Sequence, residues 1–497
     1  MATLEQALQL VSLLESELIR RRAEIDRNDD YYRGNQPLKF ASDDFAKFHG
    51  DRYREFSDNW VQVVADSPVE RLTVNGFQAF GEERADKELA LVWQLNGLDG
   101  DSQLGFLGAV NSARSFVLVW GNPDDEETPV VTFEDASQCI IAYEPGSRVQ
   151  RRAALKRWQD GNMDFATLYL PDELWKFSRP LSRQDKSPQM AAVDEAMALW
   201  LPAEAERRRR TWEPRELDEP NPQPNPMGLV PMVELPNKPM LIADPISDVT
   251  GVVAMQNAIN LLWAQLFTAS DYASFPQRVV LGAERPMIPK LNEAGEIVGK
   301  QPVDLAKFAV DRVAWITGKD AKIAEWQAAN LAAYTQIIEV AVGHLAAQTR
   351  TPQHYLIGKM ANLSGDALLA AETGLVKRVD EKKLWYGQAL REVARLVFLA
   401  RGEDAKAKAM RAGSVLWADS ESRSAAQLAD SLVKLRDIGF PFEWLARRYG
   451  LTPTEVADVV AMREREAEMD PVAAATSLLA QRSGAQDVGA EPDEAVA

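Results

Sequence analysis

Two segments far apart in the sequence carry the same narrow line of apolar residues. In each of them an apolar residue recurs after three or four positions, the spacing of one side of an α-helix. The members are Val252, Met255, Ile259, Leu262 and Leu266, then Leu331, Tyr334, Ile338, Ala341 and Leu345. A line this narrow suits packing against neighbouring helices better than lying on a broad core. The pattern predicts two helices that need helical partners.

The residues between these helices follow a different pattern. From position 273 to 326 the chain is rich in β-prone residues, with a hairpin predicted at residues 292–295. The order is therefore helix, small α/β excursion, helix.

The first 240 residues predict a mixed α+β domain. Helices are expected over about residues 4–27, 53–74 and 85–95. From about position 115 the period changes to that of strands, separated by turn pairs such as Gly121-Asn122 and Asp160-Gly161. Such spacing is typical of an antiparallel β meander.

A polar stretch, "TRTPQHYLIGKMANLSG", follows the second seamed helix. Loops of this length inside a compact protein are usually functional or disordered. One long helix is expected from residue 364 to about 401, and the remainder is predicted to be helical. The Ala-, Gly- and acid-rich tail from residue 471 should be mobile.

Composition excludes several classes of protein. The chain has 497 residues and a net charge of −18, which argues against nonspecific wrapping of nucleic acid over the whole surface. Cys139 is the single cysteine, so neither a disulfide framework nor a cysteine-based zinc site is expected. The charged, amphipathic start does not resemble a signal peptide, and no apolar run suggests a membrane span.

Motifs for catalysis are missing from the sequence. The nearest approach to a phosphate-binding loop, "GEIVGKQ", is one residue short and ends in Gln. Neither H-E-x-x-H nor G-x-S-x-G occurs, and three scattered histidines do not suggest a metal site. We therefore expect no enzyme activity, cofactor or metal, although an unrecognised nucleic-acid enzyme stays an alternative.

A second alternative is a helix-turn-helix DNA-binding protein. "FEWLARRYGLTPTEVADVVAMRERE" has two helical segments joined by a short turn, with Arg447 and Arg448 before the turn. The second helix begins with Thr454 and Glu455 and carries Asp458, whereas recognition helices normally present basic or amide residues. Plain helical packing is favoured here.

Several stretches, in their order and spacing, resemble the portal proteins of tailed bacteriophages, most of all those of long-tailed phages of actinobacteria. They are "DDYYRGNQPLKF", "DNWVQVVADSPVERLTVNGF", "NPMGLVPMVEL", "SDVTGVVAMQNAINLLWAQLFTASDYASFPQRVVLG" and "SGDALLAAETGLVKRVDEKKLWYG". The resemblance covers about residues 4–470. It implies a mostly helical α+β subunit with wing, stem, clip and crown regions, assembled into a ring with a central channel.

The resemblance also implies a division of the chain. Residues 1–240 would be the wing, 241–272 the first stem helix, 273–326 the clip, 327–349 the second stem helix, 350–363 a tunnel loop, 364–402 a long wing helix, 403–470 a helical crown and 471–497 a mobile tail. The loop would present Arg350, His354, Lys359 and Asn362 to DNA phosphates, contacts that position DNA without reading its sequence.

The implied function is that of a structural virion protein. About twelve subunits would form a head-to-tail connector at one capsid vertex, through which double-stranded DNA is packaged and ejected. The implied partners are the major capsid protein, scaffolding protein, terminase and a head-completion adaptor, with assembly in the host cytoplasm and no membrane contact.

Overall fold

The computed structural model describes residues 2–37, 56–82, 84–181, 211–216, 220–274, 278–281, 287–291, 296–302, 322–325, 330–358, 365–421, 425–451 and 453–469. The chain divides into two compact units. The larger unit comprises Met1–Gln36, Asn59–Ala254 and Leu345–Ala497, and the smaller comprises Pro37–Asp58 and Met255–His344. The predicted mobile tail, residues 471–497, lies outside the described residues.

The first helix of the larger unit, α1 (Leu4–Tyr32), starts at a capping box in which Thr3 and Gln6 exchange side-chain to backbone hydrogen bonds. The sequence predicted that this helix ends near residue 27, which was wrong. It continues because Asn28 and Tyr31 are buried, and the Asn28 amide donates to the carbonyl of Asn111 at 3.2 Å. Tertiary contacts thus override the polar "NDD" sequence.

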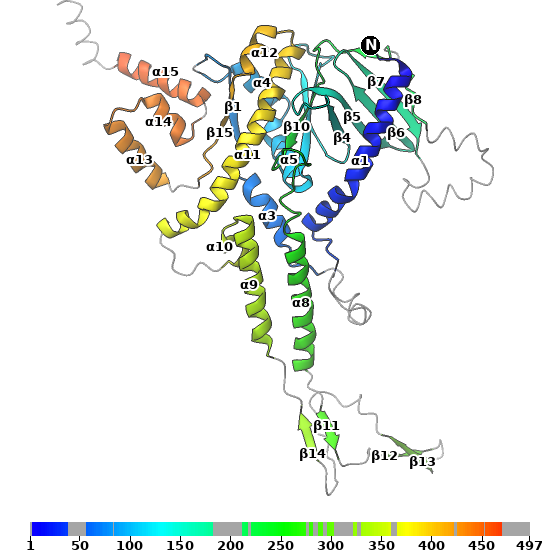
Figure 1. Cartoon of the computed structure of the whole chain (residues 1–497). Helices are drawn as coiled ribbons and strands as arrows, with labels where there is room; N and C mark the ends of the chain where they lie inside the picture. Colours follow the sequence, from blue (N-terminus) through cyan, green and yellow to red (C-terminus); the bar gives the residue numbers. More distant parts are fainter. Residues whose placement is uncertain are drawn as a thin grey trace, which may run out of the picture. The chain divides into compact units, whose positions relative to one another are not determined.

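Among the described residues of the larger unit, the strands form three antiparallel sheets, parts of which can be followed in Figure 1. The largest has the order β4-β5-β6-β7-β8, with β9 also pairing with β7, and the second has the order β10-β2-β3. The strands are β2 (Arg114–Trp120), β3 (Val130–Glu134), β4 (Cys139–Tyr143), β5 (Arg151–Asp160), β6 (Met163–Tyr169), β7 (Glu173–Pro180), β8 (Glu213–Pro214), β9 (Gln223–Pro224) and β10 (Met232–Pro236). The apolar side of α1 packs on the largest sheet through Val11, Leu14 and Leu18.

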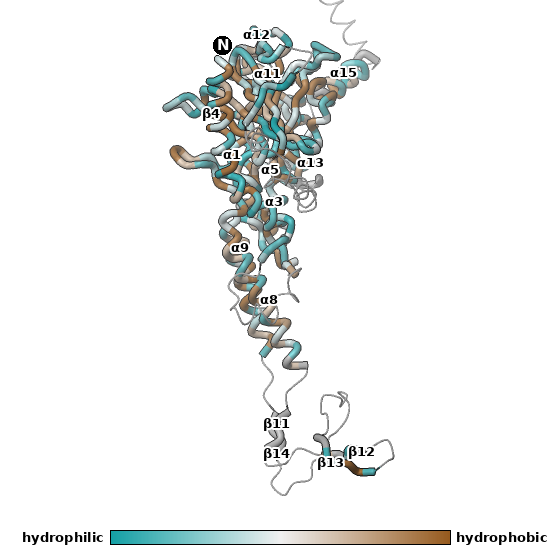
Figure 2. The backbone as a smooth tube through the Cα atoms, turned by 90° about the vertical axis from the view of Figure 1, so that its right-hand side faces the viewer, coloured by the Kyte–Doolittle hydropathy of each residue, from teal (hydrophilic) through white to brown (hydrophobic). Residues whose placement is uncertain are grey.

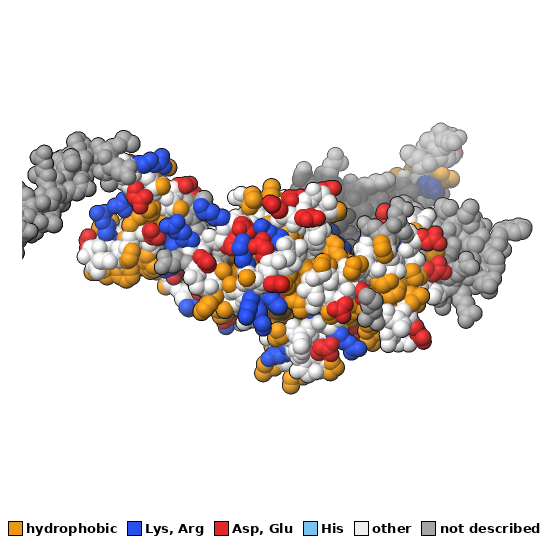
Figure 3. Space-filling model, turned by 90° about the horizontal axis from the view of Figure 1, so that it is seen from above, with side chains coloured by type: hydrophobic (Ala, Val, Ile, Leu, Met, Phe, Trp, Pro, Cys, Tyr) orange, Lys and Arg blue, Asp and Glu red, His pale blue; other side chains and the backbone are white. Residues whose placement is uncertain are grey.

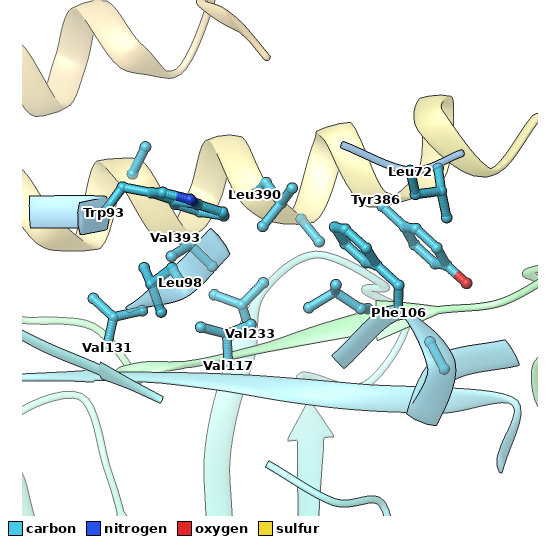
Figure 4. Packing of buried hydrophobic residues seen from close by; sticks show 14 of the residues in the cluster. Leu72, Trp93, Leu98, Phe106, Val117, Val131, Val233, Tyr386, Leu390 and Val393 are labelled. Atoms are coloured by element: carbon cyan, nitrogen blue, oxygen red, sulfur yellow. The ribbon is translucent and has the colours of Figure 1, made fainter. Parts of the chain in front are cut away.

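The main core lies between the β10-β2-β3 sheet and a set of helices. These are α3 (Trp60–Val69), α4 (Lys87–Leu95), α5 (Leu98–Ser112), α11 (Gly365–Ala400) and α12 (Asp404–Met410). Figure 4 shows Phe106 of α5 facing Tyr386 of α11, with Val117 and Val233 on the sheet side. The rings of Phe106 and Tyr386 are stacked, with centroids 5.3 Å apart.

The third sheet joins distant parts of the chain. Its strands are β1 (Val74–Gln78) and β15 (Ser414–Trp417), which pair in antiparallel register. The sequence predicted residues 403–470 to be helical, and β15 corrects that prediction. "SVLW" follows Gly413 and contains the β-branched Val415 and the aromatic Trp417, residue types that suit a strand. Helices α13 (Ala425–Asp437), α14 (Phe442–Tyr449) and α15 (Pro453–Met469) follow.

In the smaller unit, α8 (Val253–Ser274) and α9 (Leu331–Thr349) lie side by side (Figures 1 and 2). Between them in sequence, β11 (Arg278–Leu281) pairs with β14 (Lys322–Glu325), and β12 (Met287–Leu291) pairs with β13 (Ile297–Pro302). Both pairs are antiparallel. The predicted hairpin turn, residues 292–295, lies outside the described residues.

Candidate subunit and nucleic-acid contact sites

The apolar residues that the sequence predicted to form the seams of α8 and α9 are buried or half-buried. Val252, which precedes α8 in a turn, is buried together with Ile259, Leu266, Ile338 and Leu345. Half-buried members complete the set: Met255, Leu262, Leu331, Tyr334 and Ala341. These residues therefore have neighbours already within one subunit, and their role between subunits stays a prediction.

Another side of α8 is covered by a short segment of the same unit. Phe56 packs edge-on against Phe267, with ring centroids 5.0 Å apart, and also contacts Trp263. The Trp263 indole donates to the carboxylate of Asp58 at 2.8 Å, and the Gln256 amide donates to the backbone carbonyl of Asp58 at 2.7 Å. Two sides of α8 are therefore covered by other residues of the same chain, the side of the seam and the side that contacts Phe56 and Asp58.

Helix α9 keeps a second apolar stripe that the sequence reading did not identify. Ala333, Ile337, Val340 and Ala347 follow one another at helical spacing and are exposed, with the polar and exposed His344 between the last two. The sequence contained a signal for this stripe. Its residues recur at the same three- and four-residue steps as the predicted seam, two or three positions further along the chain. An uncovered apolar stripe on a helix is a surface suited to a helical partner.

The segment after α9 contains a short helix, α10 (Gln353–Ile357). The sequence predicted a polar loop over residues 350–363 and did not anticipate this five-residue helix within it. The assignment of these residues to a tunnel loop stays a prediction. Pro352 precedes the helix and Gly358 ends it in the left-handed conformation, a combination that starts and stops helices.

The four residues predicted to face DNA fall in different environments. Arg350 is exposed, and its guanidinium donates to the carboxylate of Glu381 at 3.1 Å. His354 is mostly enclosed, with its Nε2 4.0 Å from the carboxylate of Glu372 and its ring against Tyr355. Lys359 and Asn362 lie outside the described residues. Of the two described residues, Arg350 is the exposed one, and the contact of either with DNA stays a prediction.

The chain segments on either side of the α8–α9 insertion are held together by one arginine of α11. The buried Arg378 donates to Asp248 at 2.5 Å, and to the carbonyl of Thr349 and the hydroxyl of Thr351. It also donates to the carbonyl of Val64 at 2.9 Å. Arg378 therefore joins the start and the end of the insertion to the core helices.

Asp248 receives two further cations. Its carboxylate lies 2.8 Å from the amine of Lys382 and 2.7 Å from that of Lys238, and Lys382 also donates to Asn237. Burial of Asp248 raises its pKa, but Lys382, Arg378 and Lys238 together hold this pKa well below its usual range. Lys382 could have been recognised in the sequence, since it occupies an apolar position of α11 between Val379 and Tyr386.

Burial of Lys382 lowers its pKa from 10.5 to about 8, despite the opposing attraction of Asp248. The folded protein then binds fewer protons than the unfolded chain between pH 8 and 10.5, so this group's contribution to stability rises with pH over that interval. We expect the difference in free energy of unfolding between wild type and Lys382→Met to change across this interval. Urea unfolding at several pH values measures it. A pH-independent difference would show that Lys382 titrates normally.

Charges on the described surface seen in Figure 3 are mixed. On the face seen in Figure 3, acidic and basic side chains are interspersed, so the described residues there form no single acidic patch. No helix among the described ranges has the length and apolar character needed to cross a membrane. Within the same ranges, His, Cys, Asp and Glu form no cluster suited to a metal ion.

Comparison with known proteins gives the class of this chain. Residues 12–446 match the family described as "Phage portal protein, SPP1 Gp6-like", so both compact units are covered. The chain belongs to this family of phage portal proteins, and it is a structural bacteriophage protein.

Two curated relatives agree with the family. The "Portal protein" of Mycobacterium phage L5 is 26% identical over 428 residues, which cover 82% of this chain and 76% of the relative. The "Portal protein" of Mycobacterium phage D29 is 27% identical over 433 residues, covering 82% of this chain and 79% of the relative. The resemblance to portals of actinobacterial phages is confirmed.

Proposed function

We propose that this chain forms a ring of about twelve subunits at one vertex of the capsid and conducts double-stranded DNA during packaging and ejection. The observation that carries the proposal is the family match over residues 12–446. The exposed stripe of α9 supports it, because a ring supplies each subunit with a neighbour for an otherwise uncovered apolar surface.

The regions of the subunit follow from the same proposal. Helices α8 and α9 would form the stem, the strands between them the clip, and α11 the long helix of the wing. Because α9 presents Ile337 and Val340 outward, we assign the main contact between neighbouring stems to this stripe. The seam residues would then stiffen each stem from within.

We assign a conducting role without hydrolysis to the ring. A separate terminase would supply the force for packaging, while the ring would meet the major capsid protein, scaffolding protein and, later, a head-completion adaptor. Arg350 would contact DNA phosphates, which gives contacts independent of sequence. The family assignment favours this function over a helix-turn-helix regulator or an unrecognised enzyme.

Electron microscopy of the purified protein tests the proposal. We expect rings with a central hole wide enough for a DNA duplex in end-on views. Monomers or closed dimers that persist at high concentration and across salt would contradict it. A Mg²⁺-dependent ATPase and nuclease assay on the same sample should show no turnover, and turnover that follows the ring in purification would contradict the conducting role.

Replacing Arg350 by Ala should leave rings intact and reduce DNA packaging or retention. The ion pair with Glu381 is exposed, and such pairs contribute about 0–1 kcal/mol to stability, so folding should be preserved. Ring formation is measured by microscopy, and packaged DNA by nuclease protection in assembled heads. Glu381→Ala is the matched control, because it removes the same ion pair and keeps Arg350. Equal defects in both variants would assign a structural role to the pair.

A further inference from the structure

Three cations share one buried carboxylate in the larger unit, where the two ends of the α8–α9 insertion meet. Arg378 and Lys382 are buried beside Asp248, and the amine of Lys238 lies 2.7 Å from the same carboxylate. In the part of the chain that the structure describes, the ion pairs of these three cations are all made with Asp248. Positive charge is therefore in excess, and excess charge at a buried place is costly unless an anion compensates it.

A cavity of about 220 Å³ lies beside this cluster. Its wall includes Lys238, Asp248 and Arg378, together with Arg350 and Glu381. One water molecule takes up about 30 Å³ in the liquid, so the cavity has room for a group of the size of a phosphate. An anion in the cavity would compensate the excess charge without entering the core.

Two of the cations on the cavity wall have side chains that a ligand can reach. Arg378 is 5% exposed and directs its guanidinium at groups of the protein. The side chains of Lys238 and Arg350 are 41% and 54% exposed, respectively. A lysine amine has three N–H donors and a guanidinium has five, so the ion pairs with Asp248 and Glu381 do not exhaust them.

The same two residues hold a backbone conformation that side-chain-bearing residues rarely adopt. The φ angle is 45° at Lys238 and 54° at Arg350, in the left-handed region that favours glycine. Such a conformation costs free energy and is found most often at functional sites. The fold thus maintains two strained residues on the wall of one small cavity, which supports a role for their side chains.

We propose that this cavity binds a phosphate group, with Lys238 and Arg350 as its direct ligands and the cations around Asp248 as a further source of attraction. A phosphate presents acceptor oxygens in several directions, so it can accept hydrogen bonds from an amine and a guanidinium at once. Free inorganic phosphate and the backbone of double-stranded DNA offer this same chemistry. Only the second source rests on the proposed function.

Thermal unfolding of the full-length protein in inorganic phosphate tests the site. A ligand that binds the folded state raises the unfolding midpoint in a saturable way, and this concentration dependence gives the dissociation constant. Chloride replaces phosphate at equal ionic strength as the reference. We expect Lys238→Gln to weaken phosphate binding about tenfold or more, the usual effect of losing one charge-assisted hydrogen bond.

Lys406→Gln is the matched control, because phosphate also stabilises proteins without binding to a site. The Lys406 amine lies 2.7 Å from the Glu88 carboxylate and its side chain is 44% exposed, but it is not part of the cavity wall. This variant should bind phosphate like wild type. Arg350→Gln is a second test variant and should weaken binding by a similar factor, since its ion pair with Glu381 is exposed and contributes little to folding.

Fluorescence anisotropy of a labelled DNA duplex, measured in chloride with the same variants, identifies the source of the phosphate. Weaker DNA binding in Lys238→Gln, with competition by inorganic phosphate in wild type, would assign the site to the DNA backbone. Unchanged DNA binding beside weakened phosphate binding would assign it to free phosphate.

Equal responses to phosphate in wild type, Lys238→Gln, Arg350→Gln and Lys406→Gln would overturn the site. That result would leave the proposed ring standing. Absence of rings in wild type would contradict the proposed function and leave the phosphate test valid, because all residues of the cavity wall belong to one subunit.

Discussion

Replacing Arg378 by Met should lower the free energy of unfolding by about 3–5 kcal/mol, the usual cost of removing one partner from a buried ion pair. The guanidinium is buried and makes hydrogen bonds to Asp248, Thr349, Thr351 and Val64. Without it, the carbonyls of Thr349 and Val64 lose this donor, and Asp248 keeps the two lysines and the amide of Asn237. Methionine preserves most of the aliphatic volume, so the change isolates the polar contacts.

The neighbouring Lys377 provides the matched control. It is exposed on the same helix, so Lys377→Met should change the free energy of unfolding by less than about 0.5 kcal/mol. Urea unfolding followed by circular dichroism compares the variants. If Arg378→Met unfolded at the same urea concentration as Lys377→Met, the contacts of Arg378 with the two ends of the insertion would not contribute to the stability of the fold.

Replacing Phe106 by Ala should cost about 3–5 kcal/mol, the range for truncating a buried aromatic side chain. Phe106 is completely buried, stacks on Tyr386 and lies 5.8 Å from the ring of Trp417. The three aromatic residues come from α5, α11 and β15, so the cavity would open where three distant parts of the chain meet. The midpoint of thermal unfolding should fall accordingly.

Leu104, on the same helix, provides the control that distinguishes the loss of a buried side chain from a change in helix propensity. Its side chain is 68% exposed, and Leu104→Ala should leave the unfolding midpoint almost unchanged, because Ala is also a strong helix former. A Phe106→Ala variant as stable as Leu104→Ala would mean that the surrounding side chains close the cavity completely.

The elements best predicted from sequence were those with a long, regular period. The apolar spacing indicated a helix over about residues 364–401, and α11 spans Gly365–Ala400. Helix α1 was predicted with the correct start but ended too early, because the contacts of Asn28 and Tyr31 are made with residues far along the chain. The apolar period of a sequence indicates that a helix is present. The residue at which the helix ends depends on the tertiary contacts of its last turn, which the period does not show.

Features that depend on distant partners could not be read from the sequence. Strand β15 has four residues, and its pairing with β1 becomes evident only in three dimensions. The same holds for Arg378 and Asp248, whose proximity no local pattern encodes. Helix α10 was missed for a different reason: its start and stop residues were visible, but five residues are too few for a periodic signal.

The pairing of β1 with β15 also bears on when this protein can fold. The main core needs residues of α11 as well as those of α3 to α5, and β1 stays unpaired until Ser414–Trp417 have been synthesised. Because the ribosome delivers α11, α12 and β15 after all the other parts of this core, the larger unit cannot complete its core during most of translation. Incomplete chains should therefore lack the finished unit, which would keep them from joining a growing assembly.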